Sequence, residues 1–275
     1  MSFTTLIFDS NIQLDNLSLS TKPESYAFGR RLYRCQIEQQ QYWLKFHLIN
    51  SHDVLEQAFE RELNFYQQNS QVRQNFLLPH QIIPLCHIKH DDDFPQHGVG
   101  LLSVATNVFF SHIQATDSIQ VIYYKILTAL QAIESMHQLG WVHGDLKAEH
   151  FRLYENSCRL IDFEQSYQLQ PIHNLTATPH YMAPELFHGK PKTLQTDLYA
   201  FGIIVYEWLS QSKLTAKNYH EWAVLHCQKL EIELPDKLQC FLPLLTGLLQ
   251  KHVKQRFSSA IEVKNCLNAI DLLQK

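Results

Sequence analysis

The chain has 275 residues, of which 45% are hydrophobic and 18% are charged, and its formal net charge is −4. This length is sufficient for one large domain or two lobes with a sizeable core, and the composition is typical of a soluble globular protein. The weak negative charge gives no electrostatic reason to expect a nucleic-acid partner.

No targeting or membrane segment is visible in the sequence. Residues 1–5 do not begin a signal peptide. The longest apolar runs, such as residues 201–206, are far shorter than the roughly 18 residues that span a bilayer. The six cysteines form no close pairs, which favours free thiols in a reducing cytoplasm over a disulfide framework. We therefore expect a cytoplasmic protein with no membrane partner.

The first third of the chain is rich in predicted strands. These strands are residues 32–37, 42–48, 81–88 and 99–105. Residues 38–41 suit a hairpin turn between the first two strands. A helical spacing of apolar residues follows over residues 53–68, with Ser51 or Asp53 as its cap. The polar residues 90–93 are predicted to be a solvated loop.

The remainder of the chain is predominantly helical in pattern. Residues 119–139 form a long apolar helix that Gly140 is placed to end. The helices predicted after residue 190 are 196–209, 218–229, 238–249 and 258–273. A strand-rich first third with one helix, followed by a helical remainder, predicts an α+β protein. It would be a single domain over residues 1–275, with an N-terminal lobe of about 1–105 and a C-terminal lobe of about 107–275.

Two carboxylates are the candidate catalytic groups. Asp145 lies in the segment 143–150 (HGDLKAEH), directly after the long helix, and Asp162 lies 17 positions later in the segment 161–164 (IDFE). In phosphoryl transfer to a hydroxyl, the first carboxylate can accept the proton of the attacking hydroxyl. The second can hold a metal ion against the nucleotide phosphates. This order of groups predicts a phosphotransferase.

The same segments resemble motifs of the protein kinase family, and the resemblance covers nearly the whole chain. Residues 143–150 resemble H-R-D-L-K-x-x-N, and residues 162–164 resemble D-F-G. Residues 178–185 (TPHYMAPE) resemble T-P-x-Y-x-A-P-E, residues 42–45 (YWLK) resemble the V-A-I-K strand, and residues 197–202 (DLYAFG) resemble D-x-W-S-x-G. The resemblance implies a two-lobed kinase-like fold of the α+β class. Its small N-terminal lobe would hold a β-sheet and one helix, and its larger C-terminal lobe would be helical.

The resemblance also implies roles for the matching residues. Asp145 would be the catalytic base, and Lys147 would stabilise the transferred phosphoryl group. Lys45 would contact the phosphates of ATP, Glu62 would pair with Lys45, and Asp162 would bind Mg²⁺ or Mn²⁺. The partners would be ATP and a protein substrate with a serine or threonine acceptor.

Four more residues have implied supporting roles. Thr178 is the third catalytic candidate, because it would hydrogen-bond near the catalytic base. Glu185 would form a buried pair with Arg256, and Asp197 would anchor the backbone of the catalytic loop. Buried charges of this kind need such partners.

The sequence departs from the family pattern in the phosphate-binding loop. Residues 24–29 (ESYAFG) fall where G-x-G-x-x-G belongs, and only Gly29 remains of the three glycines. Glycines let the backbone approach the phosphates without a Cβ in the way. Gly29 and its neighbour Phe28 are the nucleotide-binding candidates here, unless the true register of the loop is shifted by one or two residues.

Three single positions also depart from the pattern. His150 replaces the Asn that binds a second metal ion. The histidine can ligate a metal ion, hydrogen-bond Asp145 or simply fill space. As a ligand of Mg²⁺, an imidazole is less suitable than an oxygen group. Gly144 replaces the Arg that pairs with a phosphorylated segment, which predicts no phosphate-switched activation through that Arg. Glu164 replaces a Gly, and its carboxylate can supply a metal ligand, stiffen the segment or point outward.

Two alternatives to an active protein kinase remain open. The altered loop, His150 and Glu164 favour a pseudokinase, a nucleotide-binding scaffold without turnover. Gly144 resembles the glycine of the H-G-D motif in small-molecule and atypical kinases, and His150 resembles the corresponding residue of lipopolysaccharide-core sugar kinases. Both suggest a small-molecule or sugar kinase. Residues 178–185 argue against that second alternative, since in the family this segment serves a peptide substrate.

Overall fold

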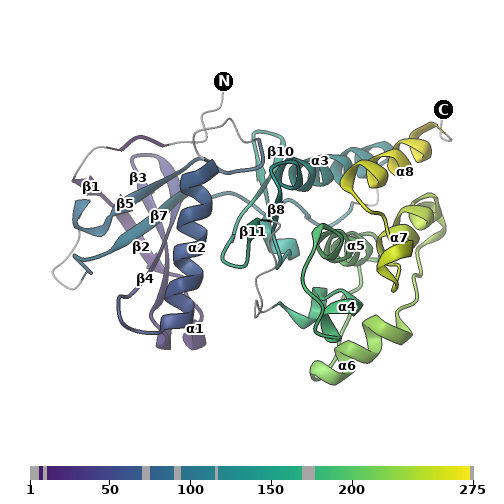
Figure 1. The fold of residues 1–275 in the computed structure, drawn as a ribbon. Helices are drawn as coiled ribbons and strands as arrows, with labels where there is room; N and C mark the ends of the chain where they lie inside the picture. Colours follow the sequence, from purple (N-terminus) through teal and green to yellow (C-terminus); the bar gives the residue numbers. More distant parts are fainter. Residues whose placement is uncertain are drawn as a thin grey trace. The chain divides into compact units, whose positions relative to one another are not determined.

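The computed structural model describes residues 6–8, 11–69, 75–89, 94–114, 117–168 and 177–272, and Figure 1 draws its ribbon. The chain divides into two compact units. The first consists of Met1–Asn107 together with Asp162–Glu164, and the second of Val108–Ile161 together with Gln165–Lys275. A three-residue segment from later in the chain therefore belongs to the N-terminal unit.

A five-stranded antiparallel sheet forms the centre of the first unit (Figure 1). In spatial order its strands are β2 (Asp15–Leu19), β3 (Arg30–Ile37), β4 (Gln40–His47), β7 (Val99–Val104) and β5 (His80–Pro84). Tyr42, Leu44 and Phe46 are buried on one face of β4, and because side chains alternate along a strand, Lys45 lies on the other face. Helix α2 (Asp53–Asn69) packs beside this strand.

Three of the four predicted strands are observed in the first unit close to their predicted bounds. The predicted strands 32–37 and 42–48 are β3 and β4, and the predicted helix 53–68 is α2. The predicted strand 81–88 is wrong in its length, because β5 ends at Pro84. Proline has no N–H with which to continue the ladder.

The chain after Pro84 forms short elements in place of the long strand. Leu85–His87 is a 3₁₀ turn, and β6 (Ile88–Lys89) pairs in parallel with β1 (Ile12–Gln13). The loop predicted at residues 90–93 lies outside the described residues.

The second unit is mainly helical and also holds two short antiparallel strand pairs. The pairs are β8 (Trp141–Val142) with β11 (Tyr167–Gln168), and β9 (Phe151–Tyr154) with β10 (Ser157–Leu160). The helices are α3 (Ile119–Gln138), α4 (Pro184–Phe187), α5 (Leu194–Ser210), α6 (Tyr219–Val224), α7 (Leu242–Leu248) and α8 (Ala260–Leu272). Most of α5 is buried, which makes it the central helix of this unit.

The ends of these helices have local causes. Ser118 caps α3 by accepting a hydrogen bond from the Val121 N–H. Gly140 follows the helix with a φ of 77°, as its predicted role as terminator requires. The predicted helix 238–249 begins as a 3₁₀ turn and becomes α-helical only at Leu242–Leu248. Pro243 lies in the first turn of this helix, where no intrahelical N–H is needed.

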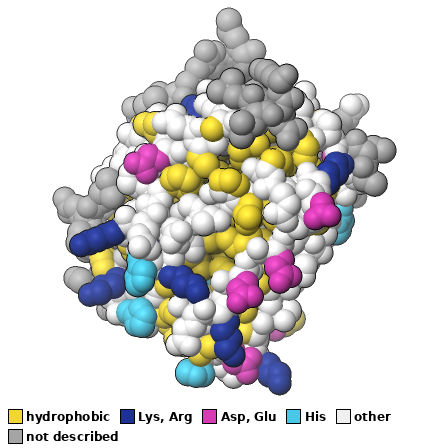
Figure 2. Space-filling model, turned by 90° about the vertical axis from the view of Figure 1, so that its right-hand side faces the viewer, with side chains coloured by type: hydrophobic (Ala, Val, Ile, Leu, Met, Phe, Trp, Pro, Cys, Tyr) yellow, Lys and Arg dark blue, Asp and Glu magenta, His cyan; other side chains and the backbone are white. Residues whose placement is uncertain are grey.

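The predicted α+β class is confirmed: an antiparallel sheet lies in the N-terminal unit and the C-terminal unit is helical. Among the described residues, none of the helices combines the length and the apolar character that crossing a membrane requires. On the face drawn in Figure 2, acidic and basic side chains of the described residues are interspersed around hydrophobic ones. No extended basic patch of described residues is visible on this face.

Candidate active-site residues

Lys45 is the centre of a cluster of three carboxylates in the first unit. Its Nζ lies 2.7 Å from Glu62 Oε2, 2.9 Å from Asp162 Oδ1 and 2.8 Å from Glu164 Oε1. Burial alone would lower the pKa of Lys45, but the charges of these carboxylates raise it well above its usual value. The ammonium group is therefore charged at every physiological pH.

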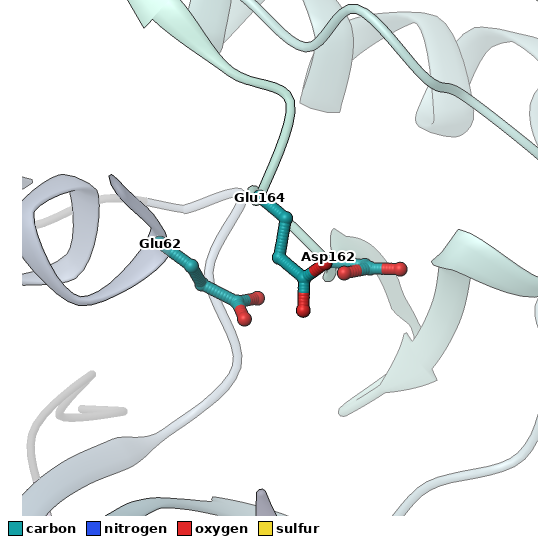
Figure 3. A group of neighbouring side chains, drawn as sticks. All are labelled: Glu62, Asp162 and Glu164. Atoms are coloured by element: carbon teal, nitrogen blue, oxygen red, sulfur yellow. The ribbon is translucent and has the colours of Figure 1, made fainter. Parts of the chain in front are cut away.

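The three carboxylates come from α2 and from the segment 162–164 (Figure 3). Their oxygens lie within 4.8 Å of one another, and Glu164 lies between Glu62 and Asp162 in this view. Burial raises the pKa of Glu62 to about 7, although the charge of Lys45 acts in the opposite direction. The predicted pairing of Lys45 with Glu62 is observed, and the segment 162–164 adds two more acidic partners.

Glu164 is buried and is held by two basic residues in addition to Lys45. Its side chain is 9% exposed. Its Oε2 accepts a hydrogen bond from Arg30 Nη2, and its backbone carbonyl accepts one from Arg61 Nε at 3.1 Å. The alternative in which this carboxylate points outward is therefore wrong. The glutamate instead ties its segment to β3, β4 and α2.

The neighbours of Glu164 are also fixed within the first unit. Asp162 has a φ of 67°, a left-handed conformation that is uncommon for residues other than glycine and that often marks functional sites. The Phe163 N–H donates to Glu62 Oε1 at 3.0 Å, and the Phe163 ring stacks on Phe65 with centroids 4.0 Å apart. Backbone and aromatic contacts thus set the position of the Asp162 carboxylate.

The predicted phosphate-binding loop lies between β2 and β3, but it forms a helical turn. Helix α1 spans Pro23–Ala27, and Gly29 follows with a φ of 92°. The N–H groups of Tyr26, Phe28 and Gly29 donate to carbonyl groups of the same turn. These three amides are therefore not directed at a ligand. In the glycine loop that the family resemblance implies, such amides would point toward the phosphates.

Asp145 lies in the second unit, where two neighbours orient its carboxylate. Its Oδ1 accepts hydrogen bonds from the Thr178 N–H at 3.0 Å and the Thr178 hydroxyl at 2.9 Å. Its Oδ2 lies 3.0 Å from Lys147 Nζ. The structure thus brings together the three residues that the sequence predicts to be catalytic.

Asp197 holds the backbone that precedes Asp145, as predicted. Its carboxylate accepts hydrogen bonds from the His143 and Gly144 N–H groups at 2.8 and 2.9 Å. It also contacts His137 Nε2 at 3.0 Å. Burial opposes ionisation, but the hydrogen bond and charge of His137 and the contacts with the loop lower the pKa of Asp197. A buried, ionised carboxylate therefore anchors the catalytic loop.

Gly144 allows a close approach that no other residue would permit. Its φ is 78°, and a Cβ at this position would lie 2.7 Å from the Gln165 carbonyl oxygen and 3.1 Å from Lys192 Cδ. Lys192 is 8% exposed. The loss of the family Arg at this position is thus accompanied by a buried lysine that packs against the glycine.

His150 is buried behind the catalytic loop. It is 4% exposed, and its ring stacks on His143 with centroids 5.6 Å apart. Burial, followed by the neighbouring His150, lowers the pKa of His143 to about 4, so His143 is neutral at neutral pH. The role of His150 as a metal ligand stays a prediction. The group of potential ligands found among the described residues consists of Glu62, Asp162 and Glu164.

The predicted pair of Glu185 and Arg256 is confirmed. Arg256 Nη1 and Nη2 contact the two carboxylate oxygens of Glu185 at 2.7 and 2.9 Å, and the arginine side chain is fully buried. Its remaining N–H groups donate to the carbonyl oxygens of Gln195 and Gln250. The pair connects the segment around Pro184 to the turn before α8.

The donor set fits a divalent cation at Asp162. Carboxylate oxygens are the ligands that Mg²⁺ and Mn²⁺ prefer, and the Asp162 side chain is 29% exposed whereas Glu62 is 1% exposed.

Two residues of this cluster, Arg30 and Arg61, were not predicted from the sequence. The one signal for Arg30 is its place directly after Gly29, and Arg61 has none beyond its position before Glu62.

Comparisons with known proteins match the part of the chain that holds residues 143–150, 162–164 and 178–185. The family model of the protein kinase domain matches residues 81–269. A probable serine/threonine-protein kinase of Dictyostelium discoideum is 31% identical over 115 residues, which are 41% of this chain and 8% of that protein. A cGMP-dependent protein kinase of Toxoplasma gondii is 32% identical over 130 residues, 46% of this chain and 11% of that protein.

A third relative covers more of the chain. The 3-phosphoinositide-dependent protein kinase B of Dictyostelium discoideum is 30% identical over 159 residues, which are 54% of this chain and 17% of that protein. The matched region is therefore less than a fifth of the length of each of these three relatives.

Proposed function

The chain belongs to the protein kinase family, and from this premise we propose that it transfers the γ-phosphoryl group of ATP to a serine or threonine hydroxyl of a protein substrate. The observation that carries the proposal is the arrangement of Asp145, which is oriented by Thr178 on one oxygen and by Lys147 on the other. A carboxylate fixed in this way is suited to position a hydroxyl and to accept its proton.

The charged residues around Asp145 support the same chemistry. Lys147 carries a cation beside the proposed base and would stabilise the charge of the transferred group. In the first unit, Lys45 would bind the nucleotide phosphates, with Glu62 as its partner. Asp162 would hold a Mg²⁺ or Mn²⁺ ion, which neutralises phosphate charge when bound.

Two observations favour a second candidate, a pseudokinase that binds nucleotide without turnover. Lys45 contacts three carboxylates, and the amides of Tyr26, Phe28 and Gly29 before β3 are used within the turn of α1. Both features weaken the binding of nucleotide phosphates that we would otherwise expect at this site. The retained base, with its two orienting partners, is the reason that we favour an active enzyme.

The test is transfer of labelled phosphate from ATP with Mg²⁺ or Mn²⁺, to the protein itself and to a generic basic protein. We expect transfer to serine or threonine, and we expect Asp145→Asn to lower the rate about 10²- to 10⁴-fold. Asp236→Asn is the matched control, because Asp236 is exposed and lies far along the sequence from the motif residues. Nucleotide binding without transfer would establish the pseudokinase instead, and absence of both would contradict each proposal.

A further inference from the structure

We propose that Arg30 is a second phosphate-binding cation beside Lys45, and that Glu164 is the positioning residue that holds the two cations together. This arrangement would replace the backbone amides of a glycine loop by side chains. The inference rests on the proposed use of a nucleoside triphosphate. It concerns two residues, Arg30 and Glu164, for which the motifs of the family provide no role.

The first step is that three amides of the segment before β3 are already hydrogen-bonded. The N–H groups of Tyr26, Phe28 and Gly29 are bonded within the helical turn α1. Arg31 reinforces this turn, since its Nη1 donates to the Tyr26 carbonyl and its guanidinium lies 3.5 Å from the Tyr26 ring centroid. These three amides are therefore not available to a triphosphate, and side chains would take a larger part in neutralising it.

The second step is the position of Arg30 near Lys45 and the hydrogen-bonding capacity of its guanidinium group. It is the first residue of β3, directly after Gly29, and it lies opposite His47 on β4, two residues along that strand from Lys45. Its side chain is 25% exposed. Among the described residues, its guanidinium bonds to Glu164 through Nη2 alone. The other N–H groups of its planar fork are thus available for phosphate oxygens.

The third step is the role of Glu164. One carboxylate oxygen binds Lys45 at 2.8 Å and the other binds Arg30, so a single group holds two like charges side by side. Without it, the two cations would repel each other in a partly buried site. The Arg61 contact with the Glu164 carbonyl fixes the backbone from which this carboxylate extends.

The formal charges of the cluster balance before a metal ion or nucleotide is bound. Lys45, Arg30 and Arg61 carry three positive charges against the three negative charges of Glu62, Asp162 and Glu164. A divalent metal ion bound at Asp162 would make the net charge of this cluster positive. Arg30 and Lys45, each in contact with Glu164, would then be the cations that bind phosphate oxygens.

The experiment measures nucleotide affinity by calorimetry, with ATP and with adenosine, in the presence of Mg²⁺. For Arg30→Met we expect the Kd for ATP to rise about tenfold or more, while the Kd for adenosine stays within about twofold. For Glu164→Gln we expect a smaller rise, about three- to tenfold, again for ATP alone. In steady-state assays the same variants should raise the KM for ATP more than they lower kcat.

Arg34→Met is the matched control, because Arg34 lies on the same face of β3, is exposed, and bonds to Gln41. It should bind ATP like the unchanged protein. If Arg30→Met melts at a lower temperature, Arg30→Gln is measured in its place. An unchanged ratio of ATP to adenosine affinity in the Arg30 variants would overturn the inference, and so would tighter ATP binding by Glu164→Gln.

The outcomes separate this inference from the proposed function. If the unchanged protein binds ATP but transfers no phosphate, the proposed function fails while the affinity comparison still decides the role of Arg30. If transfer occurs and Arg30→Met has no effect on ATP, only the inference fails. If the unchanged protein binds no nucleotide, both are contradicted.

Discussion

Gly144 illustrates how a single residue can determine the local backbone beside the proposed base. Its φ of 78° lies in the left-handed region, and a Cβ would meet the Gln165 carbonyl oxygen at 2.7 Å. We expect Gly144→Ala to lower the free energy of unfolding by about 2 to 4 kcal/mol, the sum of left-handed strain and steric overlap. Denaturant unfolding measures this change.

A matched glycine separates the two causes. Gly140 has nearly the same φ, 77°, but a Cβ at this position would have no heavy atom within 4 Å among the described residues other than its immediate neighbours in the chain. Gly140→Ala should therefore cost only the backbone strain, about 1 to 2 kcal/mol. Equal losses in the two variants would show that the contact with Gln165 has no energetic effect.

The same residue shows what a motif comparison cannot detect. The sequence shows that the family Arg is absent at Gly144, but it does not show that Lys192 packs there. A Cβ at residue 144 would lie 3.3 Å from Lys192 Nζ. Such a contact between distant residues has no periodic or motif signal. The sequence alone therefore does not predict that a cation lies next to this position.

At the scale of elements, the bidentate pair of Glu185 and Arg256 connects α4 to the turn before α8. Arg256 is fully buried and its guanidinium also binds two carbonyl oxygens. We expect Arg256→Met to destabilise the protein by about 3 to 5 kcal/mol, because Glu185, whose side chain is 11% exposed, would be left as a largely buried charge without its cation. Chemical denaturation at pH 7 tests this value.

An ion pair at the surface provides the control for this prediction. Lys264 Nζ lies 3.1 Å from Glu134 Oε2, and the Lys264 side chain is 35% exposed. Lys264→Met should therefore cost less than about 1 kcal/mol. A loss at Arg256 as small as the loss at Lys264 would contradict the assigned anchoring role.

The elements also show which parts of the fold could be predicted from sequence patterns. The alternation in β4 and the helical spacing of α2 and α3 follow from which faces are buried, so these elements were predictable. Helix α1 was not, because five residues are too few for a periodic signal and the turn depends on Arg31. The pairs Lys45–Glu62 and Glu185–Arg256 were predicted from motifs, whereas Arg30 was found only through its contact with Glu164.

At the scale of the whole molecule, the segment Asp162–Glu164 brings residues from later in the chain into the charge cluster around Lys45. It leaves the second unit after Ile161 and re-enters it at Gln165. Within the first unit, Phe163 is fully buried and lies against Phe65 and Tyr66. The aromatic contacts fix the segment, and the flanking Asp162 and Glu164 then reach Lys45. Folding of the N-terminal unit therefore requires residues that are far away in the sequence.

Buried histidines should make the stability of the whole protein depend on pH. Burial lowers the pKa of His226 to about 4, and burial with the neighbouring His150 lowers the pKa of His143 to about 4. In the unfolded chain both titrate near 6.5. Between pH 6.5 and 4 the unfolded state thus binds more protons, and stability is lost as the pH falls. Each histidine contributes a slope of up to about 1.4 kcal/mol per pH unit.

The test compares slopes, because Glu62 acts in the opposite direction. Its pKa is raised to about 7, so its contribution is lost as the pH rises through 7. We expect His226→Gln to unfold in urea with a shallower pH dependence between pH 6.5 and 5 than the unchanged protein. The exposed His220 is the control, and His220→Gln should leave the slope as it was. Since the Glu62 contribution is common to all three proteins, an equal slope in His226→Gln would mean that His226 is not held neutral by its burial against Tyr199.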